Sequence, residues 1–275
     1  MKVMESKMNI INGMSIRSAR DFVNALSLYE GNERVFNPWR DYDERYDVPQ
    51  AAQIRQAQLA AYLEPRLGTA PYVVVAEAVG YQGGRFTGIA ITCERMLLGH
   101  HKTIKPHMIL KAVGPDLKGL GTGEQGILGS SKEVGKLGGA GEVGAQWTSR
   151  SDSPYIEKTT QKQLGFNEPT DTVVWNSIVE NGLDPYKVLL WNIFPFHPHK
   201  VQESLSNRTP TPDELDAGWA YTKALLALNG EAKVFAVGQK AAQTLAHYGV
   251  EAVALRHPAN GGANLYKMQF KEALK

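Results

Sequence analysis

The sequence predicts an α/β fold with a mainly parallel sheet, and three observations predict it. Four short apolar runs, rich in β-branched residues, are typical of strands buried on both faces. Segments with apolar residues at helical spacing alternate with these runs. Glycine and proline mark the turns between them. Strands that alternate with helices form a parallel sheet with helices packed on it. The first predicted strand begins at residue 72. The other three cover residues 186–196, 232–237 and 251–255.

The helical segments follow from apolar spacing and from start and stop signals. Two of them, residues 15–29 and 50–67, precede the first strand, and Gly68 ends the second. A helix over residues 171–181 ends at Gly182 and precedes the second strand. The sequence Thr211-Pro-Asp-Glu carries a cap residue, proline and acidic residues, so it opens a helix over residues 211–228. A last helix, residues 239–248, precedes the fourth strand.

Composition limits the class of protein. The 275 residues are 43% hydrophobic and 21% charged, which is ordinary for a soluble globular chain, and we expect one domain over residues 1–275. The single cysteine, Cys93, excludes an intramolecular disulfide framework, an iron–sulfur cluster and a multi-thiolate zinc site. We find neither a membrane-length apolar run nor a secretory signal, so we expect a cytoplasmic protein. The net charge of +2 requires any polyanion site to be local.

Residues 114–146 are rich in glycine and poor in aromatic residues. Residues 121–126 spell GTGEQG, but no predicted strand precedes them and no clear helix follows, as a dinucleotide site requires. Nearby, GSSKEVGKL places Leu137 where a phosphate-binding loop needs serine or threonine. We therefore predict an inserted surface loop and no cofactor. For His100, His101 and His107 we favour a polar face over a metal site, because no acidic partner is interleaved.

Polar side chains end three of the predicted strands. Glu77 follows the first strand, Asn192 lies near the end of the second, and His257 follows the fourth. The carboxyl ends of parallel strands meet at one edge, where ligands bind. A carboxylate can orient water, an amide can read the edge of a base, and an imidazole can stabilise a developing oxyanion. Together these groups can hydrolyse a bond to a delocalised heterocycle. The alternative for each is a structural role at a strand end.

At these residues the sequence resembles the uracil-DNA glycosylase superfamily. AEAVGYQGGRFTG resembles its first motif, VLLWN its base-reading strand, and RHPANGGAN its final His-Pro turn. The resemblance implies a three-layer α/β/α sandwich around a four-stranded parallel sheet. It also implies Glu77 as the catalytic residue that activates water, Asn192 as the reader of a flipped base, and His257 as the catalytic residue that stabilises the leaving base.

The resemblance extends to residues around these three, with departures. Val79 replaces the usual proline, Ala76 an often-found glycine, and Ile91 the phenylalanine that stacks on the base. Tyr81 and Phe86 are candidate replacements for that ring. The predicted substrate-binding residues are Ala78, Val79, Gly80, Tyr81, Phe86, Ile91 and Asn192. The predicted DNA-binding residues are Arg256, Asn260, Gly261, Gly262, Asn264 and Lys267.

Three function classes follow. The first is a monofunctional, monomeric DNA glycosylase that acts on DNA with a damaged base, uracil foremost, without cofactor, metal, iron–sulfur cluster or membrane. The second is a nucleic-acid-binding protein that keeps the fold and has lost the reaction, which the departures at Val79 and Ile91 favour. The third is a nucleotide-cofactor enzyme. It ranks last, because Phe196 and His197 stand where an acidic residue would bind ribose.

Overall fold

The computed structural model describes residues 14–111 and 148–275. Its centre is a parallel sheet with strand order β3-β2-β5-β6. In register, Val75 of β2 lies beside Trp191 of β3 and Ala236 of β5. The predicted fold class is confirmed. The strands are β2 (Tyr72–Ala78), β3 (Val188–Phe194), β5 (Lys233–Val237) and β6 (Val253–Leu255).

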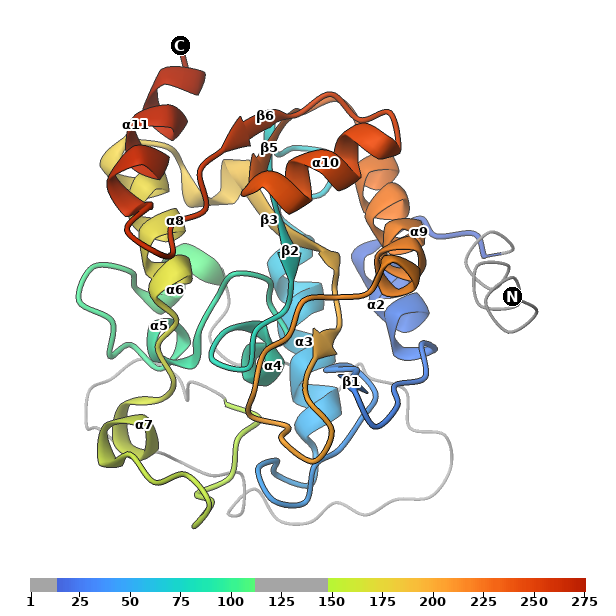
Figure 1. The fold of residues 1–275 in the computed structure, drawn as a ribbon, viewed down its shortest axis with the longest axis vertical. Helices are drawn as coiled ribbons and strands as arrows, with labels where there is room; N and C mark the ends of the chain where they lie inside the picture. Colours follow the sequence, from blue (N-terminus) through green and yellow to red (C-terminus); the bar gives the residue numbers. More distant parts are fainter. Residues whose placement is uncertain (1–13, 112–147) are drawn as a thin grey trace.

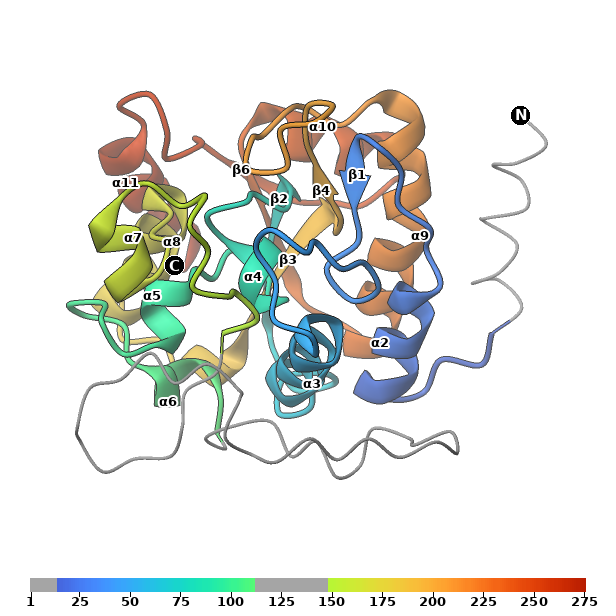
Figure 2. The same ribbon diagram turned by 90° about the horizontal axis from the view of Figure 1, so that it is seen from below.

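Helices cover both faces of this sheet (Figures 1 and 2). On one side lie α8 (Pro169–Glu180) and α11 (Ala263–Ala273), which pack on each other. On the other lie α9 (Pro212–Asn229), against β3, and α10 (Gln239–His247), against β5. Near the start of the chain, α2 (Ala19–Ser27) packs against α3 (Ala51–Leu63). The apolar side chains of these layers form one large core around the sheet.

Local sequence explains where the main helices begin and end. The side chain of Thr211 accepts a hydrogen bond from Glu214 N–H, and the Glu214 carboxylate accepts one from Thr211 N–H, which forms the capping box of α9. Ser18 caps α2 through Asp21 N–H. The predicted helix over residues 50–67 ends earlier, at Leu63, and turns then lead to β2.

Several elements were not predicted from the sequence. A small antiparallel pair joins β1 (Val35–Phe36) to β4 (His197–Pro198). The predicted second strand begins with a 3₁₀ turn, η2 (Pro185–Lys187), and ends at Phe194. The chain also forms four short helices: α4 (Gly84–Thr87), α5 (Glu94–Leu97), α6 (Pro106–Ile109) and α7 (Thr159–Leu164).

The predicted Gly-rich inserted loop at residues 114–146 falls outside the described residues. Within the described ranges, no helix has the length and apolar character needed to cross a membrane.

Candidate active site

The carboxyl ends of the four strands are joined by contacts at one edge of the sheet. Asn192 of β3 lies in register with Ala76 of β2, and its side chain donates a hydrogen bond to Ala78 O at 3.0 Å. Gly238, directly after β5, lies against His257, which follows β6: a Cβ on Gly238 would stand 3.2 Å from His257 Cβ. Asn192 therefore contacts the end of β2, and His257 contacts the residue that follows β5.

Glu77 is the acidic group at this edge. Its side chain is 26% exposed, and Lys240 Nζ lies 3.7 Å from its Oε1. Lys240 also donates a hydrogen bond to Thr209 Oγ1 at 3.0 Å. Burial raises the pKa of the Glu77 carboxyl above its usual value, and the positive charge of Lys240 opposes that rise. A largely buried carboxylate whose pKa is raised is suited to accept a proton from water.

Asn192 presents an unused acceptor. The residue is 2% exposed, and a carbonyl only accepts hydrogen bonds, so the atom that faces Ala78 O is the side-chain nitrogen. Its Oδ1 is buried and has no partner among the described residues. A buried polar atom without a partner costs free energy. An incoming group with an N–H donor would remove that cost.

His257 is held in one tautomer by its own turn. The backbone N–H of Ala259 donates to His257 Nδ1 at 3.1 Å, so Nδ1 is the acceptor and Nε2 carries the proton in the neutral ring. Burial, together with the charge of Arg256, lowers the pKa of His257 below its usual value. The ring is therefore neutral near pH 7. It can donate one hydrogen bond from Nε2.

The turn after β2 contains the residues predicted to surround a base. Asn207 Oδ1 accepts a hydrogen bond from Tyr81 N–H at 3.0 Å and lies next to Gly80. Phe86 is fully buried and stacks on Phe166, with ring centroids 5.3 Å apart. The ring of Tyr81 meets the edge of Phe166 and is only half-buried. Of the two aromatic candidates, Tyr81 is thus the one with exposed surface.

Ile91 and Val79 lie in the interior. Ile91 is 6% exposed and belongs to the main core, and its carbonyl accepts a hydrogen bond from Trp175 Nε1 at 2.9 Å. Its φ of 51° is strained for a β-branched residue. Val79 is buried, with Cγ1 against Gly84. In this structure both positions pack the turn from within.

The loop after β6 carries the predicted DNA contacts. Arg256 and Asn260 are exposed, as are Gly261 and Asn264. Gly262 is buried, and its N–H donates to Ala259 O at 3.1 Å, so this amide already has a partner. Any larger residue would collide here, because a Cβ on Gly262 would stand 2.0 Å from His257 O.

Lys267, on α11, forms an ion pair with Glu180 of α8 at 2.9 Å. Its ammonium group must leave that pair to bind a phosphate. The same helix exposes two apolar side chains that the sequence analysis did not single out, Leu265 (46%) and Met268 (68%). Exposed apolar side chains beside a loop that is predicted to contact DNA are suited to pack between bases.

Comparison with known proteins finds one matching family model and a similar solved structure. Residues 149–275, which include Asn192 and His257, match the sequence model of the uracil DNA glycosylase superfamily. This match supports an assignment of the C-terminal part of the chain to the uracil DNA glycosylase superfamily. The crystal structure of wild-type SMUG2 from Pedobacter heparinus matches with a TM-score of 0.52 at 14% identity. The match covers 94% of this chain and 97% of that one, and it shows a shared fold. No curated protein matches the sequence.

The match to the superfamily model supports a DNA glycosylase function. Glu77 precedes the matched region, so its place in the site depends on the geometry described above. Within residues 14–111 and 148–275, no group of three or more histidine, cysteine, aspartate or glutamate side chains is arranged to hold a metal ion. The side chain of His101 makes hydrogen bonds instead: its Nδ1 accepts from Ile104 N–H, and its Nε2 lies 3.3 Å from Thr172 Oγ1.

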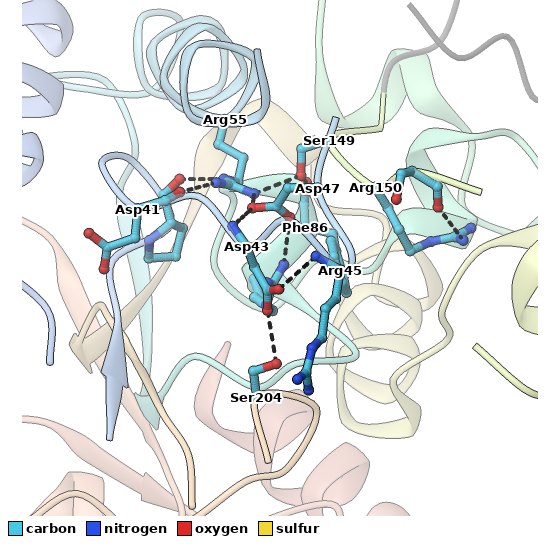
Figure 3. Close-up of polar contacts among 12 residues, drawn as sticks. Asp41, Asp43, Arg45, Asp47, Arg55, Phe86, Ser149, Arg150 and Ser204 are labelled. Carbon is cyan, nitrogen blue, oxygen red and sulfur yellow. Dashed lines mark hydrogen bonds and ion pairs between the residues drawn. The ribbon is translucent and has the colours of Figure 1, made fainter. Parts of the chain in front are cut away.

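A buried charge network lies behind the glycosylase-like first motif (Figure 3). Asp47 is fully buried between two arginines, with Arg55 Nη1 at 3.1 Å and Arg85 Nη1 at 2.9 Å. Arg85 belongs to α4 and also reaches Asp43 at 3.2 Å. Ser149 receives a hydrogen bond from Arg55 and donates one to Phe86 O at 2.7 Å. The network thus fixes α4, the helix that follows the turn at Gly80 to Gly84.

Sequence reasoning missed Lys240, Thr209 and Asn207. Lys240 carried a usable signal, since it lies in the first turn of the helix that follows β5, at the same sheet edge as Glu77. Thr209 and Asn207 belong to the segment between β4 and α9, whose path the sequence pattern does not predict. Residues in such an irregular segment follow no hydrophobic periodicity from which their positions could be predicted.

Proposed function

We propose that this protein is a monofunctional DNA glycosylase that removes a flipped base, uracil first among the candidates, by hydrolysis of its N-glycosidic bond. A base stacked in a duplex is out of reach of any side chain, so the nucleotide must rotate out of the helix before reaction. The match of residues 149–275 to the superfamily model and the set of groups at the sheet edge support the proposal.

The observation that carries the proposal is the Oδ1 of Asn192, a buried acceptor with no hydrogen-bond partner in the part of the chain that the structure describes. Its amide nitrogen is already committed to Ala78 O, so the free atom is an acceptor. Uracil presents a ring N–H between two carbonyls, and that donor matches the acceptor. Hypoxanthine and xanthine carry a comparable N–H beside a carbonyl, whereas the ring nitrogen of cytosine at that position is an acceptor. The buried amide therefore favours bases with a ring N–H.

The proposed reaction uses one water molecule. Glu77 accepts a proton from that water while the water oxygen forms a bond to C1′ of the sugar. The bond between C1′ and the base nitrogen breaks, and its electron pair moves onto the base, where negative charge develops on a carbonyl oxygen. The neutral His257 donates a hydrogen bond from Nε2 to that oxygen, and this interaction is stronger in the transition state than in the ground state. The base anion then takes up a proton, and Glu77 releases the proton that it accepted, so the products are the free base and an abasic site with an intact strand.

DNA would lie across the loop after β6. Arg256 is an exposed cation beside the His257 turn, and it is suited to bind phosphate without reading sequence. Lys267 would join it after leaving Glu180. Leu265, exposed at the start of α11, is suited to occupy the space that a flipped base leaves in the stack.

An oligonucleotide panel tests the proposal. Matched strands carrying uracil, hypoxanthine, xanthine or a mismatched normal base are incubated with excess protein, and abasic sites are cleaved with alkali. We expect cleavage at uracil and no strand scission before alkali. Glu77→Gln serves as the control for a contaminating activity. If the wild type binds these strands but cleaves none, the protein is instead a nucleic-acid-binding member of the fold.

A further inference from the structure

We infer that Lys240 is a positioning residue for the proposed reaction, which keeps the carboxylate of Glu77 charged and fixed for its encounter with water. The inference rests on the proposed function. It concerns a residue outside the three motifs that resemble the superfamily. The observation behind it is a contact between the end of β2 and the start of α10, the helix that follows β5.

The geometry ties three segments together. Lys240 lies in the first turn of α10, and its Nζ is 3.7 Å from Glu77 Oε1. The same Nζ donates to Thr209 Oγ1 at 3.0 Å, in the segment before α9. Fixing a lysine side chain costs conformational entropy, and the hydrogen bond to Thr209 offsets part of that cost. The ammonium group is thus held between a carboxylate and a hydroxyl.

Glu77 needs such a partner. Its Oε1 is buried and forms no hydrogen bond within the described ranges. Among the charged groups of those ranges, Lys240 is the one that acts on Glu77, and it opposes the effect of burial. Desolvation alone favours the protonated carboxyl, which cannot take a proton from water. The positive charge therefore keeps the reactive form present at lower pH.

A different role for Lys240 predicts different results. Its side chain is 56% exposed, so it is also accessible to a phosphate of bound DNA. A phosphate contact would change DNA affinity and its salt dependence and would leave Glu77 unaffected. A positioning role changes the titration of Glu77 in the free protein. The two roles are thus separated by a measurement without DNA.

The test is an NMR titration of protein labelled with ¹³C at the glutamate carboxyl carbons, with the Glu77 signal assigned from its loss in Glu77→Gln. Lys240→Gln removes the charge, Lys240→Arg keeps it, and Lys223→Gln removes an exposed lysine of α9 as a matched control. We expect the pKa of Glu77 to rise in Lys240→Gln and to stay near the wild-type value in Lys240→Arg and Lys223→Gln. An unchanged titration in Lys240→Gln overturns the inference.

Single-turnover excision across pH then connects the charge to the reaction. Below the midpoint of the rising limb, we expect Lys240→Gln to be about two- to fivefold slower than wild type, the range for a partly exposed ion pair, and to recover as pH rises. A loss that is equal at every pH and that tracks weaker DNA binding would assign Lys240 to phosphate. If Glu77 shifts by NMR while the wild type excises no base, the proposed function fails and the ion pair remains.

Discussion

The backbone N–H of Ala259 donates a hydrogen bond to Nδ1 of His257 at 3.1 Å. This contact places the ring proton on Nε2, the nitrogen that does not face the turn. Arg256 and burial both lower the pKa of His257, so the neutral donor is the form present at neutral pH. The His-Pro turn thus fixes the ring and its tautomer in a single local contact.

His257→Ala removes this donor. We expect single-turnover excision to fall by about 10²- to 10³-fold, as for the loss of one oxyanion donor. Affinity for DNA with an abasic site should change much less, because phosphate contacts dominate it. His247→Ala, at an exposed position on α10, is the matched control. Equal rates for His257→Ala and wild type would remove His257 from the mechanism.

Glu77→Gln tests the water-activating role. The amide cannot accept a proton from water, so we expect a loss of at least about 10²-fold in single-turnover rate with fold and DNA affinity kept. Because burial raises the pKa of Glu77, the wild-type rate should also fall as pH drops through that pKa, when the carboxylate takes up a proton. An unaltered rate in Glu77→Gln would leave water activation to a backbone group of the turn.

Asn192→Asp tests how the base is read. Asparagine donates to Ala78 O at 3.0 Å, and an aspartate oxygen there would oppose that carbonyl unless it were protonated. The pattern of donors and acceptors that is proposed to face the base would change, while the loop predicted to contact DNA would not. We expect a changed order of preference in the base panel and nearly unchanged affinity for abasic DNA. The same order of preference as wild type would make Asn192 a structural link between β3 and β2.

Asp47→Asn tests the network behind the first motif. Asp47 is paired with Arg55 and Arg85, and all three side chains are fully buried. Breaking a buried pair leaves charge without compensation, so we expect a loss of about 3–5 kcal/mol in the free energy of unfolding. Glu30→Gln, which breaks an exposed pair with Arg40, is the control and should cost at most about 1 kcal/mol. Urea unfolding measures both, and equal costs would show that the network contributes little.

His197 should make stability depend on pH. It is fully buried, its Nε2 donates to Ser206 O, and burial lowers its pKa to about 3 from 6.5. Below pH 6.5 the unfolded chain binds a proton that the folded chain does not, so stability falls by about 1.4 kcal/mol per pH unit toward the folded pKa. His197→Gln should flatten that slope between pH 6.5 and 5, whatever its effect on stability at pH 7. A slope equal to that of wild type would show that His197 is protonated in the folded protein.

The strands and main helices were predictable because their signals are local. Val73, Val74 and Val75 form a run of β-branched residues that is typical of a strand buried on both faces. The capping box of Thr211 and Glu214 is recognisable from the spacing of these two residues in the sequence. The helix α11 was missed because it follows directly on a glycine-rich turn and carries exposed apolar residues such as Met268. Such exposed apolar residues interrupt the polar face that is typical of a surface helix.

The site was predictable only where it depends on strand ends. Glu77 and Asn192 lie near the carboxyl ends of β2 and β3, and His257 follows β6, so the topology alone assigns them to one edge. Arg55 and Arg85 look like surface residues in the sequence, because the aspartate that allows them to be buried belongs to a separate loop. Sequence patterns carry periodicity within an element. They do not predict which residues of separate loops form ion pairs with each other.

The most direct test of the proposed glycosylase activity is the amount of free base released per protein molecule. Protein in excess is mixed with a uracil-containing strand, and released uracil and abasic sites are counted separately by mass spectrometry and alkaline cleavage. We predict equal amounts of both from the wild type, with both lowered at least about 10²-fold in Glu77→Gln and in His257→Ala. Release of no base from strands that the wild type binds, or equal release by wild type and both variants, would contradict the account.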